Sequence, residues 1–136
     1  MKATDLMIGD WVYAHHPSQE AQPVKVDAGL LGLMERMLIG FVKRESPLFR
    51  IVSAIPLTPE ILEKNGWTYN DENSQFHPKT WSGNGIMLKQ ENEGFRIMVV
   101  SEYDDEDTNR TPFVLRYVSD IQHALKLRGK DKEIVL

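Results

Sequence analysis

The sequence predicts an α+β fold with two antiparallel sheets, a short central helix and a C-terminal helix. Three patterns predict it: a central stretch that encodes a helix with both of its ends, apolar segments of strand length on either side of it, and an amphipathic stretch that closes the chain. We predict one domain over residues 1–136, with an N-terminal SH3-like antiparallel barrel or sheet (1–57), a clamp helix (58–66), a second antiparallel sheet (67–118) and a C-terminal helix (119–129).

The central stretch, residues 55–67, reads IPLTPEILEKNGW. Thr58 is a favoured N-cap, and Pro59 comes next at the first helical position, where its missing N–H costs nothing. Asn65 and Gly66 supply the left-handed residue that commonly ends a helix. A helix of about eight residues is unstable alone, so we expect it to dock through its apolar side chains and to clamp together the segments on its two sides.

Near the N-terminus, Gly9 and Asp10 form a turn signal in the pattern LMIGDWVYA. We expect this turn to lead into a strand with Trp11 and Tyr13 on one face and Val12 on the other. Small SH3-like barrels often begin in this way, which is the basis for the predicted barrel.

Residues 28–38 allow two interpretations. Leu30, Met34 and Leu38 lie at helical spacing, but Gly29 and Gly32 each weaken a helix by about 1 kcal/mol relative to alanine. The alternative is a strand from Val24 to Leu33 with a hairpin partner from Met37 to Lys43, and then a strand from Phe49 to Ala54. We favour the strands, because residues 47–57 read as extended and a small barrel needs these partners.

The second half of the chain reads as an antiparallel sheet with a helix after it. Ser119 and Gln122 have the spacing of a capping box, and we expect the helix that they begin to pack on the second sheet. The preceding segments are predicted to be a loop or irregular hairpin (68–79), a turn (82–85), a hairpin of two strands (86–90 and 95–101), an acidic loop (102–109) and a strand (112–118).

The motif IPLTPEILEKNGW, together with LMIGDWV near the start and LRYVSDIQHAL near the end, resembles a family of small uncharacterised proteins of gut Bacteroidales, often regarded as prophage- or mobile-element-derived. The resemblance spans most of the chain by order of motifs. The family's closing motif reads more like YVHQLQNL, so Ser119, Asp120 and His123 depart from it. The resemblance implies a shared fold and a phage-related setting, and it supplies no activity, cofactor or catalytic residue.

Composition excludes several chemistries. The chain has no cysteine, which rules out disulfides, thiolate zinc sites, iron–sulfur clusters and cysteine nucleophiles. Its formal charge is −4, so the overall basic charge typical of a nucleic-acid binder is lacking. Residues 1–9 lack the apolar region of a secretory signal and no apolar run has the length of a membrane span, so we expect a cytoplasmic protein without a membrane partner.

Motifs for catalysis or metal binding are weak. The histidines His15, His16, His77 and His123 show no HxH or HExxH spacing. Asp105, Asp107 and Asn109 match the start of an EF-hand loop, but Arg110 stands where glycine is required and Arg116 where the bidentate glutamate belongs. No nucleotide-binding loop or GxSxG elbow occurs. We therefore assign no catalytic residue, metal ligand or cofactor.

Aromatic and basic side chains near predicted loops and strand ends supply the candidate partner surface. It consists of Trp11, Tyr13, Lys43, Arg44, Arg50, Trp67, Tyr69 and Trp81. The leading hypothesis is a non-enzymatic interaction or accessory module that binds another protein. The alternatives are a small barrel associated with nucleic acid and a small hydrolase with a site that no motif reveals; the sequence leaves the oligomeric state open.

Overall fold

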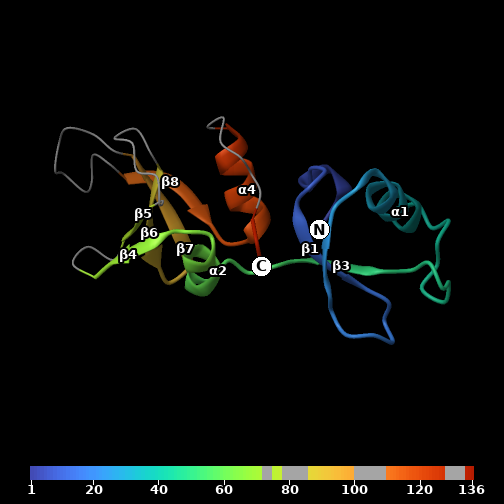
Figure 1. The fold of residues 1–136 in the computed structure, drawn as a ribbon. Coiled ribbons are helices and arrows are strands. Elements are labelled where there is room, and N and C mark those ends of the chain that lie inside the picture. The colour runs from blue at the N-terminus through green and yellow to red at the C-terminus, as the bar shows by residue number, and fades with distance from the viewer. Residues whose placement is uncertain (72–74, 78–85, 100–109, 128–133) are drawn as a thin grey trace. The chain divides into compact units, whose positions relative to one another are not determined.

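The computed structural model describes residues 1–71, 75–77, 86–99, 110–127 and 134–136 and shows an α+β fold (Figure 1). The chain forms two compact units. The first takes residues 1–55 and, far along the chain, the segment from Tyr117 through the C-terminal helix; the second takes Pro56–Arg116 and Ile134–Leu136. Among the helices in the described ranges, none is both long and apolar enough to cross a bilayer.

The first unit contains a three-stranded antiparallel sheet in the order β2-β1-β3. Its strands are β1 (Trp11–His15), β2 (Pro23–Lys25) and β3 (Ile51–Ala54), and a 3-10 helix, η1 (Ala3–Asp5), precedes them. Side chains alternate along β1 as predicted, since Val12 is fully buried while Trp11 and Tyr13 on the other face are half-buried. The described residues form an open sheet and no closed barrel, so the coarse prediction of an antiparallel sheet is confirmed.

Residues 28–38 form helix α1 (Ala28–Leu38), so the interpretation as strands from Val24 to Leu33 and from Met37 to Lys43 is wrong there, and only Val24 and Lys25 lie in a strand, β2. The helix begins at Asp27, whose Oδ1 accepts the Leu30 N–H at 2.7 Å. Met34 is buried, and with it Leu6, Val12 and Val26 make up the core of the unit, against which further apolar side chains of α1 pack. This packing stabilises the helix by more than its glycines destabilise it. Local helix propensity alone, without the packing, would have disfavoured the helix.

The second unit contains a five-stranded antiparallel sheet in the order β4-β5-β6-β7-β8. Its strands are β4 (Thr68–Asn70), β5 (Gln75–His77), β6 (Ile86–Glu91), β7 (Gly94–Val99) and β8 (Arg110–Leu115). The predicted β6–β7 hairpin is confirmed, and residues 68–79 contain a short hairpin. Pro112 lies in β8, an edge strand, where its missing N–H is tolerated. The predicted turn at 82–85 and the acidic loop at 102–109 fall outside the described residues.

The predicted central helix is α2 (Pro59–Lys64), and its N-cap is confirmed because Thr58 Oγ1 accepts the Ile61 N–H at 3.3 Å. Leu62 is buried in the second unit. Beyond the helix, the Asn65 side chain donates to the Val135 carbonyl at 2.7 Å and accepts the Val135 N–H at 2.8 Å. The residue that ends α2 therefore also binds the backbone of the C-terminal segment.

The C-terminal helix α4 (Val118–Leu127) lies against β1 of the first unit, so the prediction that it packs on the second sheet is wrong. The predicted capping box is wrong as well. Helix α4 begins one residue earlier, and the Asp120 carboxylate accepts the Tyr117 N–H at 3.0 Å. Ser119 and Gln122 are instead buried, because both face the interior of the first unit.

Gly94 provides a test of the hairpin. Its φ is +147°, and an added Cβ would lie 2.5 Å from the Leu115 carbonyl oxygen of β8. We expect Gly94→Ala to lower the free energy of unfolding by about 2 kcal/mol or more, measured by urea denaturation. The control is Gly32→Ala, since nothing lies within 4 Å of the added Cβ there; it should raise stability by about 0.5–1 kcal/mol. Equal effects of the two substitutions would contradict the close approach of β7 to β8.

Candidate functional site

The first unit has a polar cluster where α4 meets the turn before β1. Gln122 is almost completely buried; its Oε1 accepts the Trp11 N–H at 2.9 Å and its Nε2 donates to the Gly9 carbonyl at 3.0 Å. One side chain therefore binds both the donor and the acceptor that flank Asp10. We call Gly9, Asp10, Trp11, Gln122 and His123 the α4 anchor.

Asp10 completes the anchor from the side of the turn. Its carboxylate is fully buried and accepts the Met7 N–H at 2.7 Å and His123 Nε2 at 2.6 Å. A buried carboxylate is costly unless it is hydrogen-bonded, and these donors offset that cost. The turn is fixed further by the backbone, since the Val26 N–H donates to the Asp10 carbonyl at 2.8 Å.

The pair of Asp10 and His123 has the composition of an acid–base dyad, which bears on the hydrolase alternative. In such dyads the carboxylate orients the imidazole toward a nucleophile or a water. Here Asp10 is closed to solvent, while the His123 side chain is 29% exposed. The neighbouring Gln122 binds backbone groups of the turn with both ends of its amide. The geometry therefore favours attachment of α4 as the role of this pair.

The second unit contains an ion-pair cluster at the β6–β7 hairpin. Arg96 Nε donates to both carboxylate oxygens of Glu91, at 2.9 and 2.8 Å, and Arg110 Nη2 lies 3.3 Å from Glu91 Oε2. Arg96 Nη1 also donates to the Thr111 carbonyl at 2.9 Å, which ties the pair to β8. The hydrogen bond from Arg96 lowers the pKa of Glu91 below its ordinary value, and the same pairing raises the pKa of Arg96.

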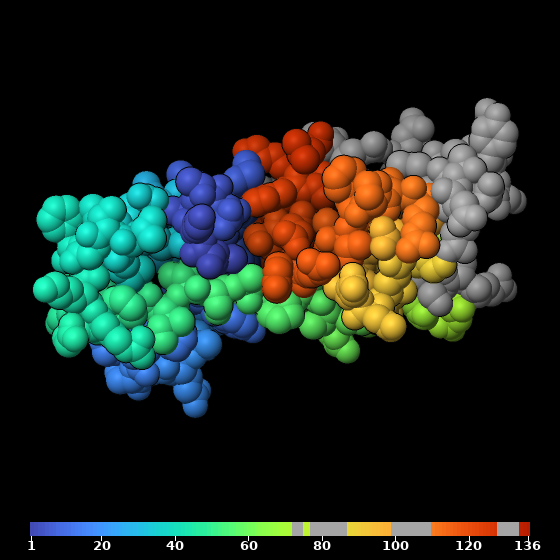
Figure 2. Space-filling model, turned by 180° about the vertical axis from the view of Figure 1, so that it is seen from behind, coloured from blue at the N-terminus to red at the C-terminus, as the bar shows by residue number. Residues whose placement is uncertain are grey.

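A third feature is an exposed apolar surface at the end of α1. Leu38, Ile39, Phe41 and Leu48 are between 56% and 80% exposed. We call these four residues, with the exposed Arg36, Lys43 and Arg44, the 38–48 surface. In Figure 2 this part of the chain, coloured cyan, forms an uncovered face of the first unit. Large apolar side chains gathered on a surface mark sites of interaction.

The segment that carries this surface is folded and not extended. The Val42 N–H donates to the Arg36 carbonyl at 3.1 Å, and two successive turns are closed by the Ser46 and Phe49 N–H groups. Arg50 Nη1 donates to the Pro47 and Phe49 carbonyls at 2.7 and 2.8 Å. The exposed side chains are therefore held on an ordered backbone, which lowers the entropy cost of binding.

The predicted partner surface is divided by this fold. Lys43 and Arg44 are exposed beside the apolar side chains of the 38–48 surface, whereas Arg50 holds the loop together. Trp11 and Tyr13 are half-buried on β1. Trp67 is 7% exposed and Tyr69 is 37% exposed, and both belong to the second unit. Trp81 and the side chain of His77 lie outside the described residues.

Sequence reasoning missed the α4 anchor and the apolar part of the 38–48 surface. The anchor joins residues 111 to 113 positions apart, which no local pattern reports. Ile39 and Phe41 were assigned to a strand, where alternate residues would have been buried.

Within the described ranges, no group of three histidine, aspartate or glutamate side chains could hold a metal ion. No protein-family model, curated protein or solved structure matches the chain.

Replacing Gln122 by methionine tests the α4 anchor. The shape is kept, but the Trp11 N–H and the Gly9 carbonyl lose their partner, and each buried group left unpaired costs about 1–3 kcal/mol. We expect Gln122→Met to lower the free energy of unfolding by about 2 kcal/mol or more in urea denaturation. Gln19→Met, on the exposed loop between β1 and β2, is the matched control and should change stability little. If Gln122→Met has the same free energy of unfolding as wild type, α4 is held by other contacts.

The Glu91 cluster predicts a specific acid dependence of stability. Because the pKa of Glu91 is lowered on folding, its contribution is full above the ordinary value of 4.5 and is lost as the pH falls through the folded-state pKa. Wild-type protein should therefore lose more stability than Glu91→Gln below about pH 4.5, measured by urea denaturation across the acid range. Glu93→Gln, which removes an exposed partner of Arg116, should track the wild-type curve. Parallel curves for wild type and Glu91→Gln would contradict this role of the ion pair.

Proposed function

We propose that this protein is a non-enzymatic interaction module that binds another protein through the 38–48 surface. The observation that carries the proposal is the exposure of Leu38, Ile39, Phe41 and Leu48 on one ordered segment. Exposing these side chains costs hydrophobic stabilisation of about 25 cal/mol per Å², and a partner that covers them recovers it. Aromatic side chains and arginine are also enriched where proteins bind one another, and the surface contains Phe41, Arg36 and Arg44.

The charge of the surface indicates the chemistry of the partner. The segment exposes three basic side chains, Arg36, Lys43 and Arg44. It exposes two acidic side chains, Glu35 and Glu45. The chain as a whole carries −4, so this face differs in sign from the average of the protein. Two copies of the surface would repel each other, whereas an apolar face bordered by carboxylates would match it. The expected partner is therefore a different protein with an acidic rim around an apolar patch.

The cellular setting of the proposal comes from the family resemblance. Small proteins of phages and mobile elements often act by binding a host or phage protein, and the resemblance of the chain to such a family supports an accessory role of this kind. Binding of this type needs no cofactor, because apolar contact and charge complementarity supply the affinity.

Association with nucleic acid is the second candidate, supported by Lys43 and Arg44. Stacking on bases would need an accessible aromatic face on the same unit. Trp11 is half-buried, and Lys25 Nζ lies 5.4 Å from the centre of its ring. Phe41 is exposed, but the other exposed large apolar side chains of its segment, Leu38, Ile39 and Leu48, are aliphatic and suit a protein partner better than a phosphate backbone.

The test is capture of partners from host lysate by tagged wild-type protein, before and after nuclease treatment. The variant Ile39→Ser/Phe41→Ser should retain the captured protein at least about tenfold less, because truncating hot-spot residues costs about 2 kcal/mol or more. Leu127→Ser removes an exposed leucine of α4 outside the surface, and should bind as wild type does. Lys43→Glu/Arg44→Glu should also weaken binding.

Two results would contradict the proposal. Equal retention by wild type and Ile39→Ser/Phe41→Ser would remove the 38–48 surface as the binding site. Loss of every partner after nuclease, with binding that falls steeply as salt rises, would instead favour association with nucleic acid.

A further inference from the structure

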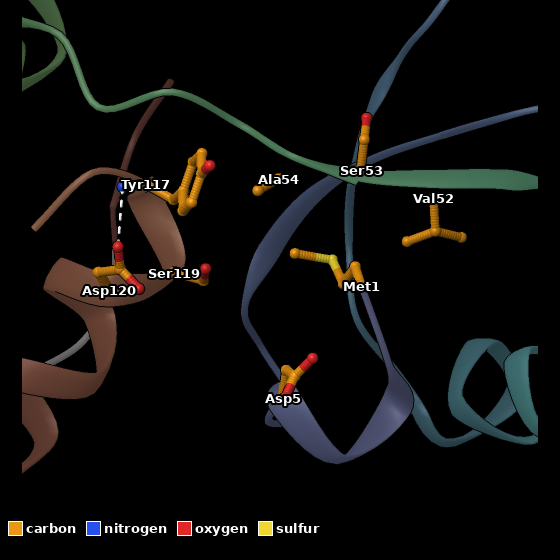
Figure 3. Close-up of a pocket in the computed structure, with 8 residues that line it drawn as sticks. All are labelled: Met1, Asp5, Val52, Ser53, Ala54, Tyr117, Ser119 and Asp120. Atoms are coloured by element: carbon orange, nitrogen blue, oxygen red, sulfur yellow. Dashed lines mark hydrogen bonds between the residues drawn. The ribbon is translucent and has the colours of Figure 1, made fainter. Parts of the chain in front are cut away.

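The polar groups of the pocket at the start of α4, in the first unit, are satisfied by the chain itself. Asp5 and Asp120 line this pocket together with Met1 (Figure 3). The Asp5 carboxylate accepts the Lys2 N–H at 2.9 Å. The Asp120 carboxylate accepts the Tyr117 N–H at 3.0 Å. No buried side-chain nitrogen or oxygen in the described ranges lacks a hydrogen-bond partner, so this pocket requires no ligand.

In the second unit, by contrast, a short segment of the chain is bound at the end of α2. Residues 134–136 belong to this unit, whereas Leu127, at the end of α4, belongs to the first. Figure 1 shows the segment, in red, beside α2. It lies in neither a helix nor a strand, so its position depends on the side chains that hold it.

The Asn65 side chain binds the main chain of Val135 with both ends of its amide. Asn65 Oδ1 accepts the Val135 N–H at 2.8 Å, and Asn65 Nδ2 donates to the Val135 carbonyl at 2.7 Å. A residue in a sheet offers the same donor and acceptor to a neighbouring strand. Asn65 therefore binds Val135 as a neighbouring strand would, through groups that every residue except proline carries.

Helix α2 itself holds the Asn65 side chain in this orientation. Asn65 Nδ2 also donates to the Ile61 carbonyl at 2.7 Å, and the Asn65 backbone N–H bonds to carbonyls of the last turn. These contacts do not involve residues 134–136. The binding groups therefore stay in place when the segment leaves, which lowers the cost of binding another one.

The side chains of the segment alternate in burial. Ile134 is 4% exposed, Val135 is 59% exposed and Leu136 is half-buried. This alternation is typical of an extended chain. Lys64 Nζ donates to the Leu136 carbonyl, which adds a further main-chain contact. Main-chain hydrogen bonds with a pocket for one side chain are the means by which proteins recognise extended peptides.

We propose that the end of α2 is a binding site for an extended peptide segment of a partner protein, and that residues 134–136 occupy it as an intramolecular substitute. The ligand has an apolar branched side chain at the position of Ile134. At the next position its N–H and carbonyl pair with Asn65. A short segment held in this way opens at a lower free energy than a core does, so a partner's segment can replace it.

This site is independent of the 38–48 surface, because the two belong to different units of the chain. Binding at the end of α2 requires release of the chain's own segment, whereas binding at the 38–48 surface does not. Failure of one proposal therefore leaves the other standing.

The test is an NMR titration of the ¹⁵N-labelled full chain with the peptide of residues 132–136, blocked at both ends. The recipient carries Ile134→Asp, which opposes burial of the chain's own segment and empties the site. The peptide should give saturable shifts of the Asn65 side-chain amide signals. Wild-type protein should bind the peptide at least about tenfold more weakly, because its own segment occupies the site in most molecules.

A second recipient covers the case in which Ile134→Asp unfolds the second unit. Val135→Pro in the full chain removes the N–H that Asn65 accepts and keeps the apolar side chain of Ile134. In either recipient, wild-type amide positions along the β6–β7 hairpin show that the unit is folded.

Peptide variants separate main-chain from side-chain recognition. The Val135→Pro peptide lacks the N–H accepted by Asn65 and should bind at least about tenfold more weakly. The Val135→Ala peptide is the matched control, because it keeps both backbone groups and changes an exposed side chain; it should bind as the unmodified peptide does. The Ile134→Asp peptide should not bind.

A variant of the recipient identifies Asn65 as the binding group. Asn65→Asp keeps an acceptor for the Val135 N–H but replaces the donor to its carbonyl by an oxygen, and should weaken peptide binding at least about tenfold. Asn92→Asp makes the same change at an exposed position of the same unit and should leave the affinity unchanged.

Three results would overturn the proposal. The first is a folded recipient whose Asn65 signals the peptide does not shift. The second is equal binding of the Val135→Pro and Val135→Ala peptides, or of the recipients with and without Asn65→Asp. The third is dimerisation of wild-type protein that Ile134→Asp abolishes, since the occupant would then be a second copy of the chain and not a different protein.

Discussion

The contact between Gln122 and the backbone at Gly9 and Trp11 is the interaction on which the first unit depends. It joins the start of β1 to a helix 111 residues further along the chain. Asp10, between the two contacted residues, is buried, and its carboxylate accepts hydrogen bonds from the Met7 N–H and from His123. Without α4, this carboxylate would lose one of its donors and the turn would lose both amide contacts. The three-stranded sheet alone has few residues with which to replace them, so the unit requires both ends of the chain.

Short sequence patterns were sufficient to predict the elements that are specified by interactions between residues close together in the chain. Thr58, Pro59 and Asn65 specify α2 through capping and backbone geometry, and the structure has that helix. The β6–β7 hairpin is likewise predictable from two apolar runs joined by a short turn. Helix α1 was missed because its glycines oppose it locally, while burial of Met34 in the core favours it. The position of α4 was missed because its periodicity shows an apolar face but not the surface that the face covers.

The same distinction applies to the functional surfaces. Lys43 and Arg44 were recognisable as a basic pair, and they lie beside the apolar side chains of the 38–48 surface. Trp67 was included in the predicted partner surface because it is an aromatic residue near a loop. The structure shows that it is buried in the second unit, and the sequence does not show this burial. The first unit thus presents exposed apolar and basic side chains on one segment, whose combination the sequence did not reveal.

The most direct test of the α4 anchor is amide hydrogen exchange of the unmodified protein, read residue by residue by NMR. The Trp11 N–H donates to Gln122 Oε1, so its protection depends on α4. It should therefore exchange with the same opening free energy as the amides in the middle of α4, because one opening event exposes both. Fast exchange of the Trp11 amide beside a protected α4 would contradict this dependence, and so would a protected Trp11 amide beside an α4 that exchanges freely.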